Sequence, residues 1–383
     1  MPDEEPPHID YLAFLKGGPQ LKPGDILPSE RPWLSRRDWL QSQGYILRPR
    51  YQADWVPSWN TTGKVYLDCE DGAWGSKWGR HIDATRASDG AFVLLKHVES
   101  RYSPFEPEIG QYFSKPPLRD DPNNHCMPVL DVLPVPENPE GETVIVTPLL
   151  RTVHEPHFET FGEIIAFFSQ MFEGIQFMHK HGVAHRDCTF NNVMMDATPM
   201  YPHPWHPAKP ERRRDWKGRA KYYSRTQCPV KYYWIDFGHS RRYNLEDGPP
   251  LEMPQRAGDY TPPEHAGEFL GTPCNPFPTD IYLVGNMIRT HYMEASHRVL
   301  DYSGLGFMNK LVVDMVQADP AKRPTIDEVV SRFADIRKSL SAWKLRSRII
   351  YKRDNISHLW KFPRYCFSTI RYVLTRTPAI PDI

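Results

Sequence analysis

A group of polar residues in the middle of the chain has types and spacings suited to metal-assisted chemistry. His185-Arg186-Asp187 is followed five residues later by Asn192, and a second carboxylate comes at Asp236-Phe237-Gly238. Carboxylate and amide oxygens are the hard ligands that magnesium prefers. Each tripeptide alone is weak, because it would occur by chance in roughly one chain in twenty of this length. Their order along the chain therefore carries the prediction.

The patterns around these residues indicate the elements that must position them. Between residues 45 and 98, short β-type runs alternate with Gly, Asn and Asp, which predicts a small antiparallel sheet. The clearest run, residues 91–96, ends at Lys96 and alternates apolar side chains on one face. A second run, residues 143–147, precedes Pro148, which would end a strand.

The second half of the chain has a helical character. Residues 161–180 carry one continuous apolar stripe at helical spacing, and a cationic last turn and Gly182 mark the end of this helix. His185-Arg186-Asp187 thus follows a helix, whereas the run 232–235 predicts a strand leading into Asp236. Further helices are predicted at 280–290 and 311–318.

Downstream motifs extend the pattern and identify what it resembles. Pro262-Pro263-Glu264, the segment 280–285 and the segment 319–324 follow in order. With Lys96 upstream, they resemble the sequence skeleton of a eukaryotic protein kinase, from about residue 45 to 340. Within that superfamily the chain resembles the divergent kinase-like proteins expanded in mushroom-forming fungi.

The resemblance implies an α+β fold. It would be bilobal, with a small antiparallel β-sheet N-lobe and a larger, mainly α-helical C-lobe. The expected organisation is a Pro-rich N-terminal extension at 1–44, an N-lobe at 45–150, a C-lobe at 151–340 with an inserted loop at about 198–228, and a basic aromatic tail at 341–383.

The resemblance also assigns roles to the polar residues. Asp187 would accept or orient the proton of the attacking hydroxyl, next to Arg186, whose counterpart in the family often binds a phosphate on the activation segment. Asn192 and Asp236 would hold Mg²⁺. These roles match phosphoryl transfer, in which positioning and charge stabilisation do most of the work.

A lysine and a carboxylate would hold the nucleotide's phosphates. Lys96 takes this role by resemblance, although a strand lysine is ordinarily just a solvated side chain. Its expected partner on the next helix is Glu108, and Glu106 is the alternative.

The adenine site is expected from the segment between the lobes. The resemblance places backbone contacts at the hinge formed by Thr147, Leu149 and Leu150, and an apolar contact beneath the base at Met194. The plain alternative for Met194 is core packing. Glu264 and Arg323 are expected to form a buried ion pair that stabilises the large lobe.

The sequence departs from the family pattern in three places. No G-x-G-x-x-G precedes Lys96, so the close backbone approach to phosphate that such a loop allows is missing. Thr189 stands where serine/threonine kinases carry a lysine, so the acceptor class cannot be read there. The segment between Gly238 and Pro262 has few hydroxyls and several carboxylates, which predicts activity without prior phosphorylation.

Three functional hypotheses follow. The first is an ATP- and Mg²⁺-dependent protein kinase acting on a hydroxyl of an unknown protein substrate, with a serine/threonine acceptor expected. The second is a weak or inactive pseudokinase that binds nucleotide or serves as a scaffold. The third, a small-molecule kinase, is disfavoured by the Glu264 and Arg323 pairing, which belongs to protein-kinase-type lobes.

The composition of the chain also bears on whether it binds nucleic acid or zinc, forms disulfides or spans a membrane. The 383 residues carry 47 basic and 47 acidic side chains, so the overall charge gives no case for specific nucleic-acid binding. The six cysteines are scattered and include no C-x-x-C pair, so neither a zinc site nor a disulfide framework is expected. Without a signal-like start or a ~20-residue apolar run, a soluble, monomeric, cytoplasmic or nuclear protein is expected.

The tail after Leu340 is basic and aromatic. Between residues 341 and 377 it has nine Lys and Arg side chains against Asp354 alone. The plain interpretation is a segment packed on the large lobe through its aromatic groups. The alternative is contact with anionic lipid or an acidic partner, and nucleic acid is a weaker third possibility.

Overall fold

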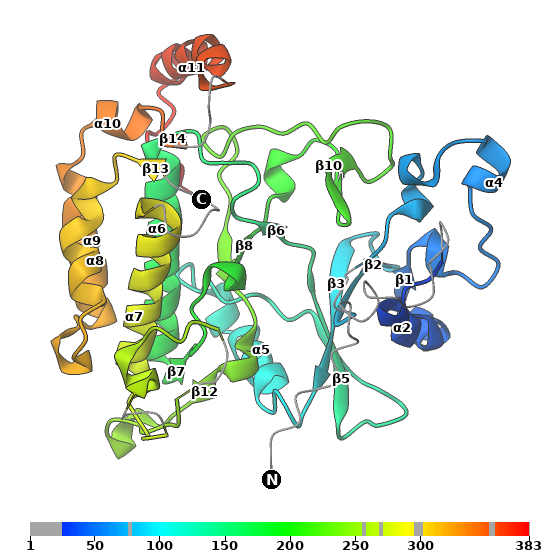
Figure 1. Ribbon diagram of the computed structural model, residues 1–383, viewed down its shortest axis with the longest axis horizontal. Coiled ribbons are helices and arrows are strands. Elements are labelled where there is room, and N and C mark those ends of the chain that lie inside the picture. Colours follow the sequence, from blue (N-terminus) through cyan, green and yellow to red (C-terminus); the bar gives the residue numbers. More distant parts are fainter. Residues whose placement is uncertain are drawn as a thin grey trace. The chain divides into compact units, whose positions relative to one another are not determined.

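The computed structural model describes residues 25–75, 79–254, 258–267, 271–294, 302–351 and 357–382. The chain forms two compact units (Figure 1). The first unit contains Met1–Glu99, Leu130–Leu149 and Tyr201–Lys221, and the second contains Ser100–Val129, Leu150–Met200 and Tyr222–Ile383. Two segments therefore group differently from the expected division, because residues 100–129 belong to the second unit and 201–221 to the first.

The first unit is built on an antiparallel five-stranded sheet, as the alternating pattern predicts. The strand order is β1-β2-β3-β5-β4. Lys96 lies on the central strand, opposite His81 on one neighbour and Ile145 on the other. The strands are β1 (Tyr45–Leu47), β2 (His81–Arg86), β3 (Phe92–Glu99), β4 (Asp131–Pro134) and β5 (Glu142–Pro148).

The core of this unit includes residues that were expected to lie in a separate extension. Val93 and Leu95 point to the buried face of β3, and Trp33 and Leu40 pack in the same cluster. The Trp33 indole donates a hydrogen bond of 2.7 Å to the Gly79 carbonyl. Helices α2 (Arg31–Ser35) and α3 (Arg37–Ser42) thus complete the core, because one face of so small a sheet needs a cover.

Two irregular segments join the sheet to the rest of the first unit. The connection from β1 to β2, residues 48–80, contains the short helices η2 (Pro49–Tyr51), α4 (Trp59–Thr62), η3 (Tyr66–Asp68) and η4 (Glu70–Gly72). Within the expected insertion, β9 (Trp205–His206) and β10 (Lys209–Arg213) form a hairpin. The Trp216 indole donates to the Asp68 carbonyl at 2.7 Å, so the insertion packs against this connection.

The second unit is organised around the long helix predicted at 161–180. α6 (Phe161–Lys180) begins at Thr160, whose hydroxyl accepts from the Glu163 N–H, and ends at His181 and Gly182. α9 (Ile326–Ser339) packs against α6, and α8 (Asn309–Met315) packs against α7 (Pro276–Ile288). Aromatic side chains fill the contact with α9, as where the rings of Phe172 and Phe333 lie 5.1 Å apart.

Short strands beside α6 position the polar residues. β6 (Arg151–Thr152), β8 (Val193–Met195) and β11 (Tyr232–Trp234) form one antiparallel sheet. β7 (Val183–Ala184) pairs with β12 (Arg241–Arg242). The loop that follows β7 and the loop that follows β11 carry the two predicted catalytic motifs. α5 (Glu106–Phe113) belongs to the same unit.

The tail packs on this second unit. β14 (Ile350–Tyr351) pairs with β13 (Tyr302–Ser303), and the Ile349 N–H donates to the Glu159 carbonyl at 3.1 Å. α10 (Ala342–Arg346) and α11 (Ser357–Leu374) follow along the tail. The expected packing of the tail is thus confirmed for these contacts. No helix among the described residues has the length and apolar character needed to cross a bilayer.

Candidate active site

One buried carboxylate holds the backbone of His185-Arg186-Asp187. Asp280 of α7 accepts hydrogen bonds from the N–H groups of His185, at 2.8 Å, and Arg186, at 2.7 Å. His179 Nε2 lies 2.9 Å from the same carboxylate. Burial alone would raise the pKa of Asp280, but the bond and charge of His179, the charge of His185 and the bond from the Arg186 N–H together outweigh it and lower that pKa. An ionised Asp280 therefore holds Arg186 in its left-handed conformation, at a φ of 68°.

Asp187 has one carboxylate oxygen bonded and one free to act. Asn192 Nδ2 donates to Asp187 Oδ2 at 2.6 Å and to the Asp187 carbonyl at 3.0 Å. Oδ1 is buried and has no hydrogen-bond partner among the described residues. Gly258 closes over this oxygen, because a Cβ there would collide with it. A buried acceptor without a donor is costly unless a ligand supplies one.

The surroundings of Asp187 raise the pKa of its carboxyl group. Burial raises its pKa, and the nearby Asp236 carboxylate adds to this effect. His185, His239 and the hydrogen bond from Asn192 act in the opposite direction but do not cancel it. The group is thus a carboxyl with raised proton affinity, as suits a proton acceptor.

Asp236 reaches this site because two strands align it with Asn192. The Ile235 N–H donates to the Asn192 carbonyl at 3.0 Å, directly beyond the pairing of β11 with β8. Asp236 itself has a left-handed backbone, with φ of 64°, and its Oδ1 accepts from the Gly238 N–H at 3.4 Å. The structure therefore brings together the three polar residues predicted from the two separate motifs.

Asn192 and Asp236 fit a magnesium ion that is completed by substrate. Asn192 uses its amide nitrogen on Asp187, and its Oδ1 has no hydrogen bond within the described part of the chain. Across the described residues no group of three His, Cys, Asp or Glu side chains could hold a metal alone. Magnesium typically takes one or two protein ligands, waters and substrate phosphates, so two oxygen donors suffice.

The Arg186 guanidinium is bonded to backbone carbonyls. Nη1 donates to the His239 carbonyl at 3.3 Å, and Nη2 to the Met253 carbonyl at 2.6 Å. The adjacent Glu252 accepts from the Tyr243 hydroxyl at 3.1 Å. Burial raises the pKa of Tyr243, with Arg186 opposing this effect and Glu252 adding to it, so both charges act on this hydroxyl.

The two glutamates weighed on α5 occupy different surroundings. Glu106 is 3% exposed, and a Cβ on Gly238 would lie 3.4 Å from its Oε2. Glu108 is exposed and lines a cavity of about 740 Å³ with Lys180, Arg241 and other residues of the second unit. The preferred choice, Glu108, thus lies on the outer side of α5, and only Glu106 approaches the loop after Asp236. Helical geometry explains this, since residues two apart face different directions.

Phe237 anchors that loop in an apolar column. Its side chain is 1% exposed, and its ring centroid lies 6.2 Å from that of Phe113 and 5.8 Å from that of His185. The column joins α5 to both polar motifs. No sequence signal singled out Phe113, because an aromatic residue on an apolar helix face is ordinarily core.

The remaining predicted residues divide between the two units. Lys96, Thr147 and Leu149 belong to the first unit, where the Leu149 N–H donates to the Phe92 carbonyl at 3.3 Å. Leu150 and Met194 belong to the second, where Met194 is half-buried on β8.

The expected ion pair between Glu264 and Arg323 is confirmed. Arg323 Nη1 and Nη2 lie 2.5 Å and 2.7 Å from Glu264 Oε1 and Oε2, and both side chains are buried. Thr279 donates to the same carboxylate at 2.8 Å. Burial would raise the pKa of Glu264, but the bonds and charge of Arg323, a backbone N–H and Thr279 together outweigh it and lower that pKa.

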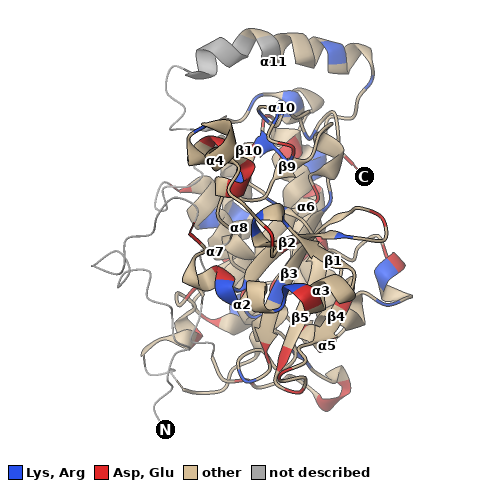
Figure 2. Ribbon diagram, turned by 90° about the vertical axis from the view of Figure 1, so that its right-hand side faces the viewer, with Lys and Arg blue, Asp and Glu red and all other residues tan. Residues whose placement is uncertain are grey.

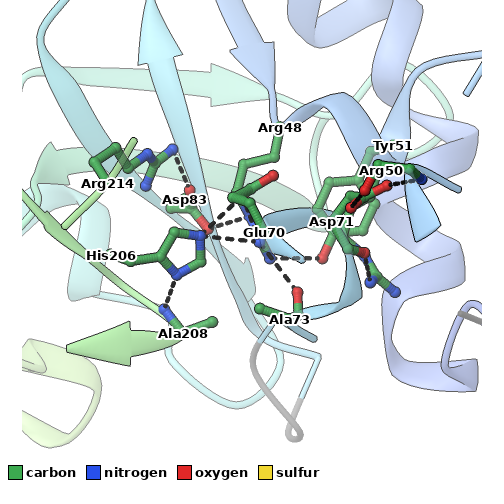
Figure 3. Close-up of polar contacts among 12 residues, drawn as sticks. Arg48, Arg50, Tyr51, Glu70, Asp71, Ala73, Asp83, His206, Ala208 and Arg214 are labelled. Atoms are coloured by element: carbon green, nitrogen blue, oxygen red, sulfur yellow. Dashed lines mark hydrogen bonds and ion pairs between the residues drawn. The ribbon is translucent and has the colours of Figure 1, made fainter. Parts of the chain in front are cut away.

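A second buried polar cluster lies in the first unit and was not predicted (Figure 3). Arg48 Nη1 contacts Glu70 at 3.1 Å, and its Nε contacts Asp83 at 3.2 Å. Arg214, from the insertion, reaches the other oxygen of Asp83 at 2.7 Å. His206 lies 2.8 Å from Glu70. These residues are far apart in the sequence, so no local spacing could have identified them.

Comparison with models of known families and with curated proteins finds nothing that matches this sequence.

Proposed function

We propose that the chain is a protein kinase, which transfers the γ-phosphate of ATP to a protein hydroxyl with the help of Mg²⁺. One observation carries the proposal. Asp187 presents a buried carboxylate oxygen without a donor, beside Asn192 and Asp236, which can supply oxygen ligands to magnesium. Phosphoryl transfer needs this combination of a group for the acceptor hydroxyl and ligands for the metal.

The arrangement of the sheet supports the same proposal. In protein kinases the phosphate-binding lysine lies on the third strand, and here Lys96 lies on β3, the central strand of β1-β2-β3-β5-β4. The glutamate that pairs with such a lysine lies on the following helix, which here is α5. The burial of Glu106 favours it over Glu108 for this role.

The residues of the second unit would then act as follows. Asp187 Oδ1 accepts the hydrogen bond of the incoming hydroxyl and orients its oxygen, while Asn192 holds Oδ2 fixed. Asn192 Oδ1 and Asp236 would hold Mg²⁺, which neutralises charge on the phosphates when bound. Met194 and Leu150 would contact the adenine, and Lys96 the α- and β-phosphates.

A specific observation also supports the alternative of a pseudokinase. The β1–β2 connection, where a kinase has its glycine-rich loop, is a segment of residues 48–80 with several short helices. Ion pairs fix it to β2, between Arg48 and Asp83, and to the insertion, between Asp68 and Arg212. Such a connection lacks the series of glycines that lets backbone N–H groups approach phosphates. Thr189 likewise offers no cation to the transferred phosphate.

The test uses the full chain with radiolabelled ATP, Mg²⁺ and generic protein substrates. We expect label transfer that Asp187→Asn lowers by about 10²–10⁴-fold, because the variant lacks the proton-accepting group. In thermal shift measurements, Asp187→Asn should keep the stabilisation by Mg-ATP, whereas Asp236→Asn should lose much of it. Stabilisation of the wild type by Mg-ATP without label transfer would establish the pseudokinase. A full Mg²⁺-dependent shift in Asp236→Asn would overturn the metal assignment.

A further inference from the structure

Two described tyrosines of α11, Tyr365 and Tyr372, contact the rest of the second unit. On its inner side, the Tyr365 hydroxyl donates to the Arg346 carbonyl at 2.9 Å. Two helical turns further along, Tyr372 is buried, and its hydroxyl lies 3.1 Å from Ser224 Oγ. These contacts fix which face of the helix is turned outward.

The outward side of α11 is apolar. Phe367, Ile370 and Leu374 are 73%, 60% and 78% exposed, and their spacing of three and four residues places them in one row. Val373, beside them, is 46% exposed. α10, to which α11 is bonded, exposes Trp343 to 75%.

Such a row requires a cover. Isolated exposed apolar side chains are normal, but a contiguous row on a helix with apolar groups on its inner side as well is typical of an interaction surface.

The charges near these exposed apolar residues indicate what kind of partner would bind this face of α11. From residue 355 to residue 381 the sequence has no Asp or Glu, but it has Lys361, Arg364, Arg371 and Arg376. Arg371 and Arg376 are exposed, and Figure 2 shows no acidic residue on the described part of α11. A second copy of the chain would bring these cations against their own equivalents, which is unfavourable in a symmetric contact.

We propose that this face of α11 binds the surface of an anionic bilayer. The helix would lie in the plane of the interface, with Phe367, Ile370 and Leu374 among the acyl chains and the arginines at the lipid headgroups. Trp343 has the amphipathic ring that is enriched at such interfaces. The face shares no residue with the candidate active site, so the test does not depend on phosphoryl transfer.

The experiment is co-sedimentation of the full chain with vesicles of phosphatidylcholine alone and of phosphatidylcholine mixed with phosphatidylserine. We expect binding to the mixed vesicles that weakens with added salt, and little binding to the neutral ones. Ile370→Glu with Leu374→Glu should lower the partition coefficient by roughly tenfold or more. Arg371→Gln should lower it roughly fivefold, the equivalent of about 1 kcal/mol per arginine.

The matched control introduces two glutamates at exposed apolar positions outside α11. Val313 on α8 and Leu251 are exposed by 57% and 71%, so Val313→Glu with Leu251→Glu should fold equally well and bind like the wild type. Circular dichroism of each variant confirms folding. Failure of the wild type to bind mixed vesicles, or equal binding by the α11 variant, would overturn the proposal. Concentration-dependent dimerisation that the α11 variant abolishes, without vesicle binding, would assign the face to a second copy.

Discussion

The two buried polar clusters of this protein differ in how completely their charges are satisfied. In the first unit, each oxygen of Asp83 lies within ion-pair distance of an arginine, and Glu70 contacts both Arg48 and His206. Asp83 Oδ2, Arg48 Nε and Arg214 Nη1 make no hydrogen bond among the described residues, so this cluster is distinguished by its compensated charges. In the second unit, Asp187 Oδ1 has no partner among the described residues, although it is equally shielded from water.

The proton affinities of the two clusters differ in the same way. Burial alone would raise the pKa of Glu70, but the bonds from His206 and Arg48 outweigh it and lower that pKa to about 2. Burial raises the pKa of Asp187, since no cation compensates it fully. The first cluster therefore stabilises the fold through its charges, whereas the second costs stability and keeps an acceptor ready for a ligand.

Removing a charge from the first cluster should change the free energy of unfolding more than any other substitution considered for the two clusters. Glu70→Gln leaves Arg48 and His206 without their carboxylate, so we expect the free energy of unfolding near pH 7 to fall by about 3 kcal/mol. A carboxyl whose pKa is lowered on folding contributes stability above its unfolded pKa, and loses it as the pH falls through the folded one. The loss should thus be greatest at neutral pH and should shrink between about pH 4.5 and pH 2.

Urea denaturation of wild type and variant at several pH values would measure this. Asp89→Asn is the matched control, because bonds from Arg86 also lower the pKa of Asp89 to about 2, but on the surface. Solvent screening should make its effect far smaller. Equal losses for Glu70→Gln and Asp89→Asn would show that burial does not distinguish the two carboxylates.

In the second cluster, removing a charge should change the free energy of unfolding by a smaller amount and in the opposite direction. Asp187 has a raised pKa in the folded state, so its ionisation destabilises the fold above that pKa, and the cost disappears as the pH falls through it. Asp187→Asn should therefore raise the free energy of unfolding near pH 7 by about 1 kcal/mol while abolishing activity. The same denaturation series checks this, and the gain should vanish in acid. A destabilised Asp187→Asn at neutral pH would mean that this carboxylate is satisfied like Glu70.

The smallest expected change in activity concerns Arg186, a buried cation of the second unit whose guanidinium already has hydrogen-bond partners. Its guanidinium is bonded to the carbonyls of His239 and Met253, and Glu252 places a carboxylate next to this segment. We expect treatment with a broad phosphatase to leave activity unchanged, because no phosphate is needed to order the segment. Glu252→Ala should lower activity a few-fold, because it removes the acceptor of the bond from the Tyr243 hydroxyl. A large loss after phosphatase treatment would show that Arg186 waits for a phosphate after all.

The chain's local patterns determine more of the second unit than of the first. The apolar stripe and the Gly182 stop predict α6 with its observed bounds, and the run before Asp236 predicts β11. Periodicity and capping are properties of neighbouring residues, so they can be read directly. The choice between Glu106 and Glu108 could not be read this way, because the phase of the short helix α5 depends on what it packs against.

In the same way, the order of Asp187, Asn192 and Asp236 follows from the sequence alone, and with it the prediction of phosphoryl transfer. That Asp187 Oδ1 has no donor among the described residues is a property of the folded chain, because it depends on the close approach of Gly258 and on the bond from Asn192 to the other oxygen. Likewise, only the tertiary structure joins Arg48, Asp83 and Arg214, whose segments are separated by up to 166 positions. Ion pairs between such distant segments leave no periodic trace, since each side chain is selected by its neighbours in space and not along the chain.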